Sequence, residues 1–344
     1  MSQNGSKNID ISVIIVAFGF PDAKLKKTLA NITNQSYSSY EIVLIWAKFP
    51  KTLDINQYFK SNSINSSKIQ FHHFEENLGY AKGNNLGSKF AKGDKIVIMN
   101  PDVETLPAFL TEMVHTFAYL QKLNRTDKIV LNPRICNRFG NIEFAKIYLN
   151  FLGFSNNNFP MSDKIQRTMI SSGCTFLISK RCFHHFHGFD ESYFMYHEDT
   201  DLSYRLQKAG FKLYVDNNIP VWHLKTDYEY KMTDFKFFYW ERNRLKFTLE
   251  NASNLKRLLL CQLLLEPLMF VYALKAGLIK QKFMIYKYFI RNFLLLNHKN
   301  HKGVLNSYEN YSSMEGIINE VPPKSIVYRS IKFYVKLLFY LYHS

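Results

Sequence analysis

The chain has 344 residues, of which 47% are hydrophobic and 16% aromatic, and its formal net charge at pH 7 is +16. This length allows one large domain or two, and the apolar content is ample for a hydrophobic core. The four cysteines form no CxxC pair. Their spacing argues against a zinc cage or a disulfide framework and fits a reducing cytosol.

The excess of Lys and Arg indicates an anionic partner, which could be a nucleic acid, a nucleotide or a membrane surface. Much of the excess lies beyond Leu255, among large apolar residues. This distribution favours a lipid headgroup surface, and because no RNA-binding motif stands out we expect no nucleic acid as partner. The polar N-terminus, MSQNGSKNID, lacks the apolar region of a signal peptide.

The first hundred residues alternate between predicted strands and predicted helices. Strands are expected at residues 11–16, 41–46, 68–74 and 95–100, and helices at residues 21–34 and 79–91. This alternation predicts an open, mostly parallel α/β sheet. Ligands bind beyond the carboxyl ends of the strands in such sheets, and Asn100 and Asp102 fall at one of these ends.

The segments become shorter and more mixed over residues 128–224, and a helix with aromatic and basic faces is expected over residues 226–251. The apolar run at residues 258–274 is interrupted by polar residues and is shorter than the ~20 residues that span a bilayer. We therefore expect a buried or interfacial helix there. The last residues, 326–344, interleave basic and aromatic side chains, as a membrane-surface helix does. A helix packed on its own domain, or a homodimer seam, is the alternative.

Three carboxylates, Glu198, Asp199 and Asp201, occur within four positions at the start of a predicted helix. Acids in a first helical turn complement the helix macrodipole. Taken alone, this pattern therefore indicates a helix start more often than a functional site.

Several motifs in a fixed order change that interpretation. They are ENLGYAKGNNLG (76–87), VIMNPDVE (97–104), SSGCTFLISKRCF (171–183), GFDESYFMYHEDTDLSYRLQKAGF (188–211) and VWHLKT (221–226). Together they resemble the inverting family-two glycosyltransferases with the GT-A fold, particularly the rhamnosyltransferase-like branch, over about residues 11–251.

The resemblance implies a fold and a domain organisation. Residues 1–251 would form a GT-A glycosyltransferase domain, a Rossmann-like, mostly parallel sheet flanked by helices. Its nucleotide-binding half would span about residues 9–125 and its acceptor-binding half about residues 126–251. Residues 252–344 would form a helical, basic and aromatic extension that associates with a membrane.

The resemblance also implies roles for the acids and for the metal site. Asp199 matches the catalytic base, which takes a proton from the acceptor hydroxyl. Asp102 and His223 match ligands of a divalent cation, Mg²⁺ or Mn²⁺, which neutralises the diphosphate leaving group. The residues expected to contact the acceptor or to orient the base are Ser172, Gly173, Glu198 and Asp201.

The nucleotide-sugar donor is expected to contact a second set of residues. The resemblance assigns Asn77, Gly79, Lys82, Asn85, Asn100 and Arg242 to it. The three glycines at 79, 83 and 87 would otherwise serve tight helix packing. The second strand usually ends in an Asp that holds the nucleotide, but here it runs into Ala47 and Lys48. Base recognition is therefore expected to use the backbone at Ala17 and Phe18 or an aromatic contact.

The function expected from these motifs is a metal-dependent hexosyltransferase or rhamnosyltransferase. It would transfer one sugar from dTDP-rhamnose or a UDP-sugar to a lipid-linked or surface-polysaccharide precursor. The protein would be cytoplasmic and peripherally associated with the inner face of the cell membrane. The alternative is a non-catalytic sugar-nucleotide or glycan-binding subunit of an assembly complex, which the missing strand-two Asp favours. A basic RNA-binding protein is a third, weaker interpretation.

Overall fold

A computed structural model of the chain describes residues 9–150, 152–156, 164–226, 229, 231–252 and 254–292. The chain divides into two compact units. The first unit contains residues 1–146 and 159–230, and the second unit contains residues 147–158 and 231–344. The terminal segment 326–344, predicted to be a membrane-surface helix, lies outside the described residues.

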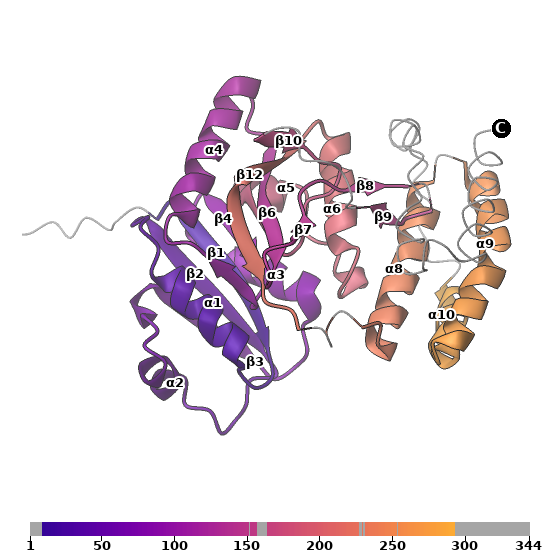
Figure 1. Ribbon diagram of the computed structural model, residues 1–344, viewed down its shortest axis with the longest axis horizontal. Coiled ribbons are helices and arrows are strands. Elements are labelled where there is room, and N and C mark those ends of the chain that lie inside the picture. The colour runs from indigo at the N-terminus through magenta and orange to yellow at the C-terminus, as the bar shows by residue number, and fades with distance from the viewer. Residues whose placement is uncertain are drawn as a thin grey trace, which may run out of the picture. The chain divides into compact units, whose positions relative to one another are not determined.

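The first unit is built on one large mixed sheet with helices against it (Figure 1). Its strand order is β10-β12-β6-β11-β4-β1-β2-β3, with β5 paired to β12 and β7 paired to β6. The strands are β1 (Ile11–Phe18), β2 (Tyr40–Ala47), β3 (Ile69–Phe74), β4 (Lys95–Met99), β5 (Val103–Thr105), β6 (Ile129–Asn137), β7 (Ile142–Phe144), β10 (Ile165–Arg167), β11 (Thr175–Ser179) and β12 (Lys212–His223).

Strands β1 to β4 are all parallel, as the sequence predicts for the first hundred residues. Strand β11 is antiparallel to both β4 and β6, and it joins this parallel half to the β6–β12 pair. The helices of the unit are α1 (Ala23–Thr33), α2 (Ile55–Ser61), α3 (Gly79–Phe90), α4 (Phe109–Asn124), α5 (Lys180–His185) and α6 (Glu198–Lys208). The predicted α/β sheet flanked by helices is therefore confirmed.

Helix α3 lies unusually close to β1 because glycines face the strand. A Cβ atom at Gly83 would lie 2.7 Å from Val16, and one at Gly87 would lie 2.4 Å from Ile14. Real Cβ atoms do not approach other atoms this closely, so any larger residue would push the helix off the sheet. The alternative of tight packing for these glycines is therefore supported at both positions.

The second unit is mainly helical. It contains α8 (Asp234–Asn251), α9 (Leu255–Lys275), α10 (Ile279–Asn292) and the short strand pair β8 (Tyr148–Leu149) and β9 (Ser155–Asn156). Its apolar core includes Leu258, Cys261, Leu265, Met269 and Ile285. Helix α8 packs with α9 and α10, so the boundary between the two compact units lies before α8. The predicted functional boundary at 251/252 lies after this helix and stays a prediction.

A buried ion cluster lies in the core of the second unit. The side chains of Glu241, Arg244 and Lys282 are all 0% exposed. Glu241 accepts from Arg244 Nε at 2.7 Å and from Lys282 Nζ at 3.0 Å. Lys282 also pairs with Glu266 of α9. The cluster therefore ties α8, α9 and α10 together.

Helix α9 has 21 residues and is long and apolar enough to cross a membrane, judged by length and composition alone. Its buried side chains include Gln262, which faces Arg244 at 3.4 Å. Such a partly buried helix also passes this test when it belongs to a soluble core. The prediction of a buried or interfacial helix is compatible with this arrangement.

Candidate active site

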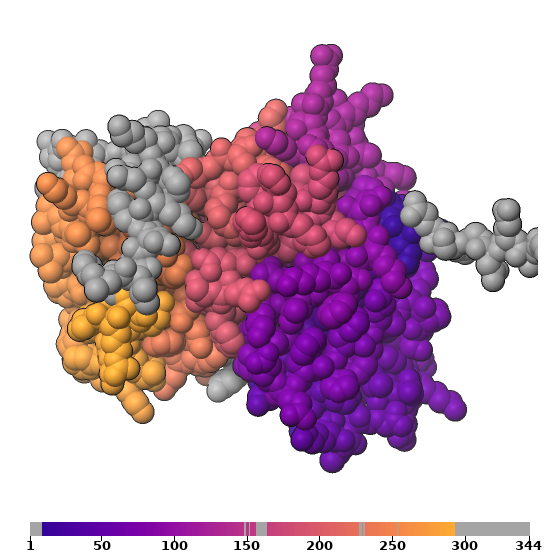
Figure 2. Space-filling view, turned by 180° about the vertical axis from the view of Figure 1, so that it is seen from behind, coloured from indigo at the N-terminus to yellow at the C-terminus, as the bar shows by residue number. Residues whose placement is uncertain are grey.

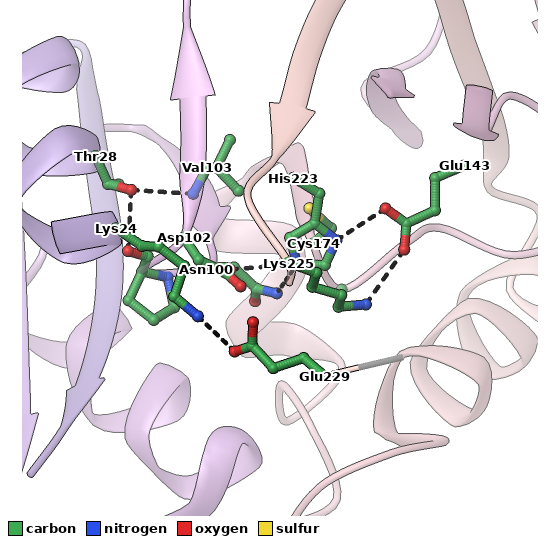
Figure 3. Close-up of polar contacts among 12 residues, drawn as sticks. Lys24, Thr28, Asn100, Asp102, Val103, Glu143, Cys174, His223, Lys225 and Glu229 are labelled. Atoms are coloured by element: carbon green, nitrogen blue, oxygen red, sulfur yellow. Dashed lines mark hydrogen bonds and ion pairs between the residues drawn. The ribbon is translucent and has the colours of Figure 1, made fainter. Parts of the chain in front are cut away.

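Asp102 and His223 meet at the carboxyl ends of two strands (Figure 3). Asp102 follows β4, and His223 is the last residue of β12. The strand β5 pairs with β12 so that Val103 lies opposite His223. This register brings His223 Nε2 to 3.2 Å from Asp102 Oδ1 and to 3.4 Å from Asn100 Nδ2.

The other ring nitrogen of His223 contacts a residue that no sequence motif indicates. Its Nδ1 lies 3.2 Å from Glu143 Oε2, and Lys225 Nζ lies 3.2 Å from Glu143 Oε1. Burial alone would raise the pKa of Glu143, but His223 and Lys225 lower it to about 2. An ionised Glu143 accepts a hydrogen bond from the Nδ1 proton of His223, and this contact orients the ring so that Nε2 faces Asp102.

The groups around His223 favour a positive charge on its ring. Burial opposes protonation of His223, but Cys174, Asp102 and Glu143 outweigh it and hold the pKa of His223 well above its ordinary value. Burial likewise would raise the pKa of Asp102, yet His223, Lys225 and Lys24 keep it below its ordinary range.

We tested whether these residues fit the divalent cation that the resemblance implies. Asp102 Oδ1 and His223 Nε2 lie 3.2 Å apart, and Glu143 contacts the other ring nitrogen of His223. Such a carboxylate–histidine pair orients a metal ligand. Within the described part of the chain, no group of three or more His, Cys, Asp or Glu residues is arranged to hold a metal ion. Asp102 and His223 would supply two ligands, so a divalent cation would need its other oxygen ligands from elsewhere, and the metal site stays a prediction.

Asp199 lies in the first turn of α6, and both of its carboxylate oxygens accept backbone hydrogen bonds. Gly173 N donates to Oδ2 at 2.9 Å, and Thr200 N donates to Oδ1 at 2.7 Å. Burial raises the pKa of Asp199, and these hydrogen bonds oppose the rise only in part. The residue as a whole is nevertheless partly exposed.

The two neighbouring acids are more deeply buried than Asp199. Glu198 is 5% exposed, and burial together with the charge of Asp199 raises its pKa well above the ordinary value. Asp201 is 1% exposed and accepts from Arg205 Nε at 2.7 Å. Arg205 in turn donates to the carbonyls of Phe186 and Gly188. Asp201 therefore holds the loop before α6, and acceptor contact by either acid stays a prediction.

The loop at residues 171–174 links the two sides of the site. Ser172 N and Ser171 Oγ both donate to Asn132 Oδ1. Gly173 bonds to Asp199 as described, and the next residue, Cys174, accepts from Asn100 N at 2.8 Å. The Cys174 side chain also lies beside His223 (Figure 3). The base candidate Asp199 and the metal-ligand candidate His223 therefore border consecutive residues of one loop, Gly173 and Cys174.

The predicted donor-binding residues of the 76–87 motif have partners within the protein. Asn77 Oδ1 accepts from Gly79 N at 3.1 Å, and Lys82 pairs with Glu76 at 2.8 Å. Asn85 donates to Phe189 O and to Glu191 Oε1, and it also accepts from Phe189 N. These contacts give Asn77 and Asn85 structural roles. A contact of this motif with the nucleotide stays a prediction.

The remaining donor candidates lie apart from this motif in the chain. Ala17 is buried, whereas Phe18, the last residue of β1, is 59% exposed at the carboxyl end of the strand. Phe18 is thus available for an aromatic contact. Arg242 belongs to the second unit, where its guanidinium lies over the rings of Tyr239 and Tyr288 and contacts Asn243.

Three comparisons with known proteins bear on this site. The model of the family described as "Glycosyltransferase like family 2" matches residues 8–245. The rhamnosyltransferase WbbL of Escherichia coli (strain K12) is 26% identical over 231 residues, which cover 62% of this chain and 81% of WbbL.

Among solved structures, the crystal structure of GalNAc-T7 with UDP, GalNAc and Mn²⁺ is similar to this chain. The TM-score is 0.53 at 17% identity, and the match covers 71% of this chain and 51% of GalNAc-T7. The chain thus spans about half the length of that structure. At this identity the likeness shows the fold alone, and it confirms the predicted GT-A fold.

Proposed function

The chain belongs to glycosyltransferase family 2, and on this premise we propose that it transfers a single sugar from a nucleotide-sugar donor with inversion at the anomeric carbon. The donor would be dTDP-rhamnose or a UDP-sugar, and the acceptor a lipid-linked or surface-polysaccharide precursor. The name of WbbL, a rhamnosyltransferase, supports a rhamnose donor. The observation that carries the proposal is the loop at Gly173 and Cys174, which borders Asp199 on one side and Asn100 and His223 on the other.

Asp199 acts as the general base in this proposal. Its carboxylate takes the proton of the acceptor hydroxyl while the hydroxyl oxygen attacks the anomeric carbon. The bond from that carbon to the diphosphate breaks, and the nucleoside diphosphate leaves with the bonding electron pair. A positioned base contributes about 10²–10⁴-fold to the rate.

Asp102 and His223 would hold a divalent cation, Mg²⁺ or Mn²⁺, with Asn100 beside them. When bound, the cation would neutralise the negative charge that grows on the leaving diphosphate. Glu143 keeps the His223 ring in the orientation that presents Nε2. Lys225 balances the charge of Glu143.

The direct test is a panel of nucleotide sugars incubated with the purified protein, with Mn²⁺, with Mg²⁺ or with a chelator. Release of nucleoside diphosphate from one donor, lost with the chelator, is the expected result. Asp102→Asn should weaken Mn²⁺-dependent donor binding in calorimetry. Donor binding without turnover on any acceptor would instead favour a non-catalytic subunit, and equal Mn²⁺ dependence in variant and parent would remove Asp102 from the metal site.

We further propose that α9 and α10 rest on the anionic surface of the inner membrane leaflet. Large apolar side chains are exposed on both helices, namely Leu259, Leu260, Leu263, Val271 and Leu274 on α9 and Phe283, Met284 and Ile290 on α10. The two helices form part of the orange and yellow surface in Figure 2. Residues 254–292 contain seven Lys and Arg, of which Lys282 is buried, but a single acid, Glu266. Exposed apolar and basic side chains together favour an interfacial membrane surface.

Charge also argues against two other occupants of this surface. The last 52 residues, 293–344, carry six Lys and Arg against three acids, so they offer no net negative charge to complement this surface. A second copy of the chain would bring the same positive surface. Against a membrane span, the buried Glu241–Lys282–Glu266 cluster ties α9 to its neighbours. A hollow of about 360 Å³, lined in part by Tyr288 and Arg291, adds a basic and aromatic recess on α10.

Sedimentation with lipid vesicles tests this surface. The protein should bind vesicles containing phosphatidylglycerol more tightly than pure phosphatidylcholine vesicles. The double variant Leu263→Asn/Ile290→Asn should lose most of this binding, since these residues are 70% and 79% exposed. The matched control is Leu123→Asn on α4 of the first unit, at a residue that is 62% exposed. Equal binding by both variants would contradict the proposed surface.

A further inference from the structure

Tyr80 connects helix α3 to the predicted base through a single glycine. Its hydroxyl donates to the carbonyl oxygen of Gly173. The amide of the same Gly173 donates to Asp199 Oδ2 at 2.9 Å. Gly173 thus contacts Tyr80 through its carbonyl oxygen and Asp199 through its amide.

Gly173 makes this double contact where a side chain would be crowded. A Cβ atom there would lie 3.3 Å from Asp199 Oδ2 and 3.3 Å from the Tyr80 hydroxyl oxygen. Both distances are tighter than ordinary van der Waals contacts. A larger residue would therefore press on the base and on Tyr80 at the same time.

The backbone of Tyr80 holds the base-carrying loop at a second point. Tyr80 N donates to Phe194 O at 2.8 Å, and Ala81 N donates to the same oxygen at 3.2 Å. The N-cap residue of α3, Leu78, makes no side-chain cap. Phe194 O therefore satisfies free amides at the positive end of this helix.

The loop between Phe194 and α6 is strained. Phe194 has φ 63° and ψ −59°, and Tyr196 and His197 also have positive φ values of 67° and 65°. Non-glycine residues hold such angles only where their surroundings impose them, and they cluster at functional sites. Gly79 makes the contact possible, since a Cβ there would lie 2.5 Å from the Phe194 ring.

We propose that Tyr80 is a positioning residue, which fixes the Asp199 carboxylate for proton abstraction by holding Gly173 and Phe194 against the start of α3. This inference rests on the proposed role of Asp199 as base. Tyr80 is only partly exposed, and its ring packs edge-on against Phe189 at 5.6 Å between ring centres. The ring fixes the hydroxyl, and the hydroxyl fixes the peptide that donates to the base.

The test is Tyr80→Phe, which removes one oxygen and keeps the ring. Since the Asp199 carboxylate would be less well held, kcat should fall by about tenfold while KM for the donor changes by less than about twofold. The matched control is Tyr40→Phe. Tyr40 also donates its hydroxyl to a backbone carbonyl, that of Ile32, at 2.8 Å, but it lies at the start of β2. This control should keep the parent kcat.

A readout without turnover separates this inference from the proposed function. Titration of the aspartate carboxyls by ¹³C NMR, with Asp199→Asn to assign the signal, should show a higher pKa of Asp199 in Tyr80→Phe. The reason is that a weakened Gly173 N–H bond favours the ionised form less. If the parent is active and Tyr80→Phe has the same kcat and the same pKa of Asp199, the positioning role is wrong.

If the parent turns over no donor, the proposed function is wrong. The pKa of Asp199 in the two proteins would still decide the role of Tyr80.

Discussion

The two units of the molecule bury carboxylates in opposite ways. In the second unit, Glu241 is 0% exposed but is met by Arg244 and Lys282, which hold its pKa below the ordinary value despite burial. In the first unit, burial raises the pKa of Glu198 and Asp199, and among the described residues neither carboxylate forms an ion pair with a cationic side chain. A buried carboxylate with cationic partners is typical of a structural ion cluster, whereas a buried carboxylate without such partners is typical of a functional site.

The difference also gives the two clusters opposite effects on stability as pH changes. Because the pKa of Glu241 is lowered, ionised Glu241 stabilises the fold above about pH 4.5, the ordinary pKa of Glu. This stabilisation is lost as pH falls through the lowered pKa. The raised pKa of Glu198 works in the other direction. Its folded form prefers the proton, so stability is fully present at low pH and is lost as pH rises from about 4.5 through the raised pKa.

The largest expected effect is a loss of turnover on substitution of Asp199, the buried proposed base. Asp199→Asn removes the proposed base without changing the size of the side chain, so turnover should fall by about 10²–10⁴-fold. Donor affinity, measured by calorimetry, should stay within about twofold of the parent. Turnover near the parent rate would exclude Asp199 as base.

The compensated cluster should instead respond in stability. Glu241→Gln leaves the buried charge of Arg244 without its carboxylate and that of Lys282 with Glu266 alone, which should cost about 3–5 kcal/mol in the free energy of unfolding. The control is Glu104→Gln, which breaks the more exposed pair with Lys27 at 2.7 Å and should cost about 0–1 kcal/mol. Similar losses in urea denaturation for both variants would contradict the comparison.

The pH profile of the enzyme should reflect the raised pKa of Asp199. A protonated carboxyl cannot accept the acceptor's proton, so kcat/KM should fall as pH falls through a midpoint above the ordinary Asp value of 3.8. Repeating the profile at higher Mn²⁺ concentration separates this effect from protonation of metal ligands, because only the latter moves with the metal. A midpoint at or below 3.8 would argue that burial does not raise the pKa of the base.

The smallest change is expected at Glu198. Glu198→Gln resembles the protonated side chain that burial already favours, so the variant should unfold no more easily than the parent near neutral pH. Any gain in stability should vanish below about pH 4.5, where Glu198 is protonated in the unfolded parent as well as in the folded one. Turnover should change by less than about tenfold. A raised KM for the acceptor would instead support the predicted acceptor contact.

The local pattern of the chain determined much of the fold and indicated the family. Alternating apolar strands and glycine-containing helices predicted the parallel sheet of β1 to β4, which the structure confirms. The motif order indicated the family, which the comparison over residues 8–245 shows. These features follow from residues near one another in sequence, where periodicity and spacing carry the information.

Only the tertiary structure decided which distant side chains meet. Glu143 lies on a three-residue strand with no motif, yet strand pairing places it 3.2 Å from His223, 80 residues away. Tyr80 and Asn85 belong to a motif predicted to bind the donor, but folding brings both against the loop that precedes Asp199. Such contacts depend on sheet register and on the close approach that glycines permit, and both are properties of long-range packing that no local pattern specifies.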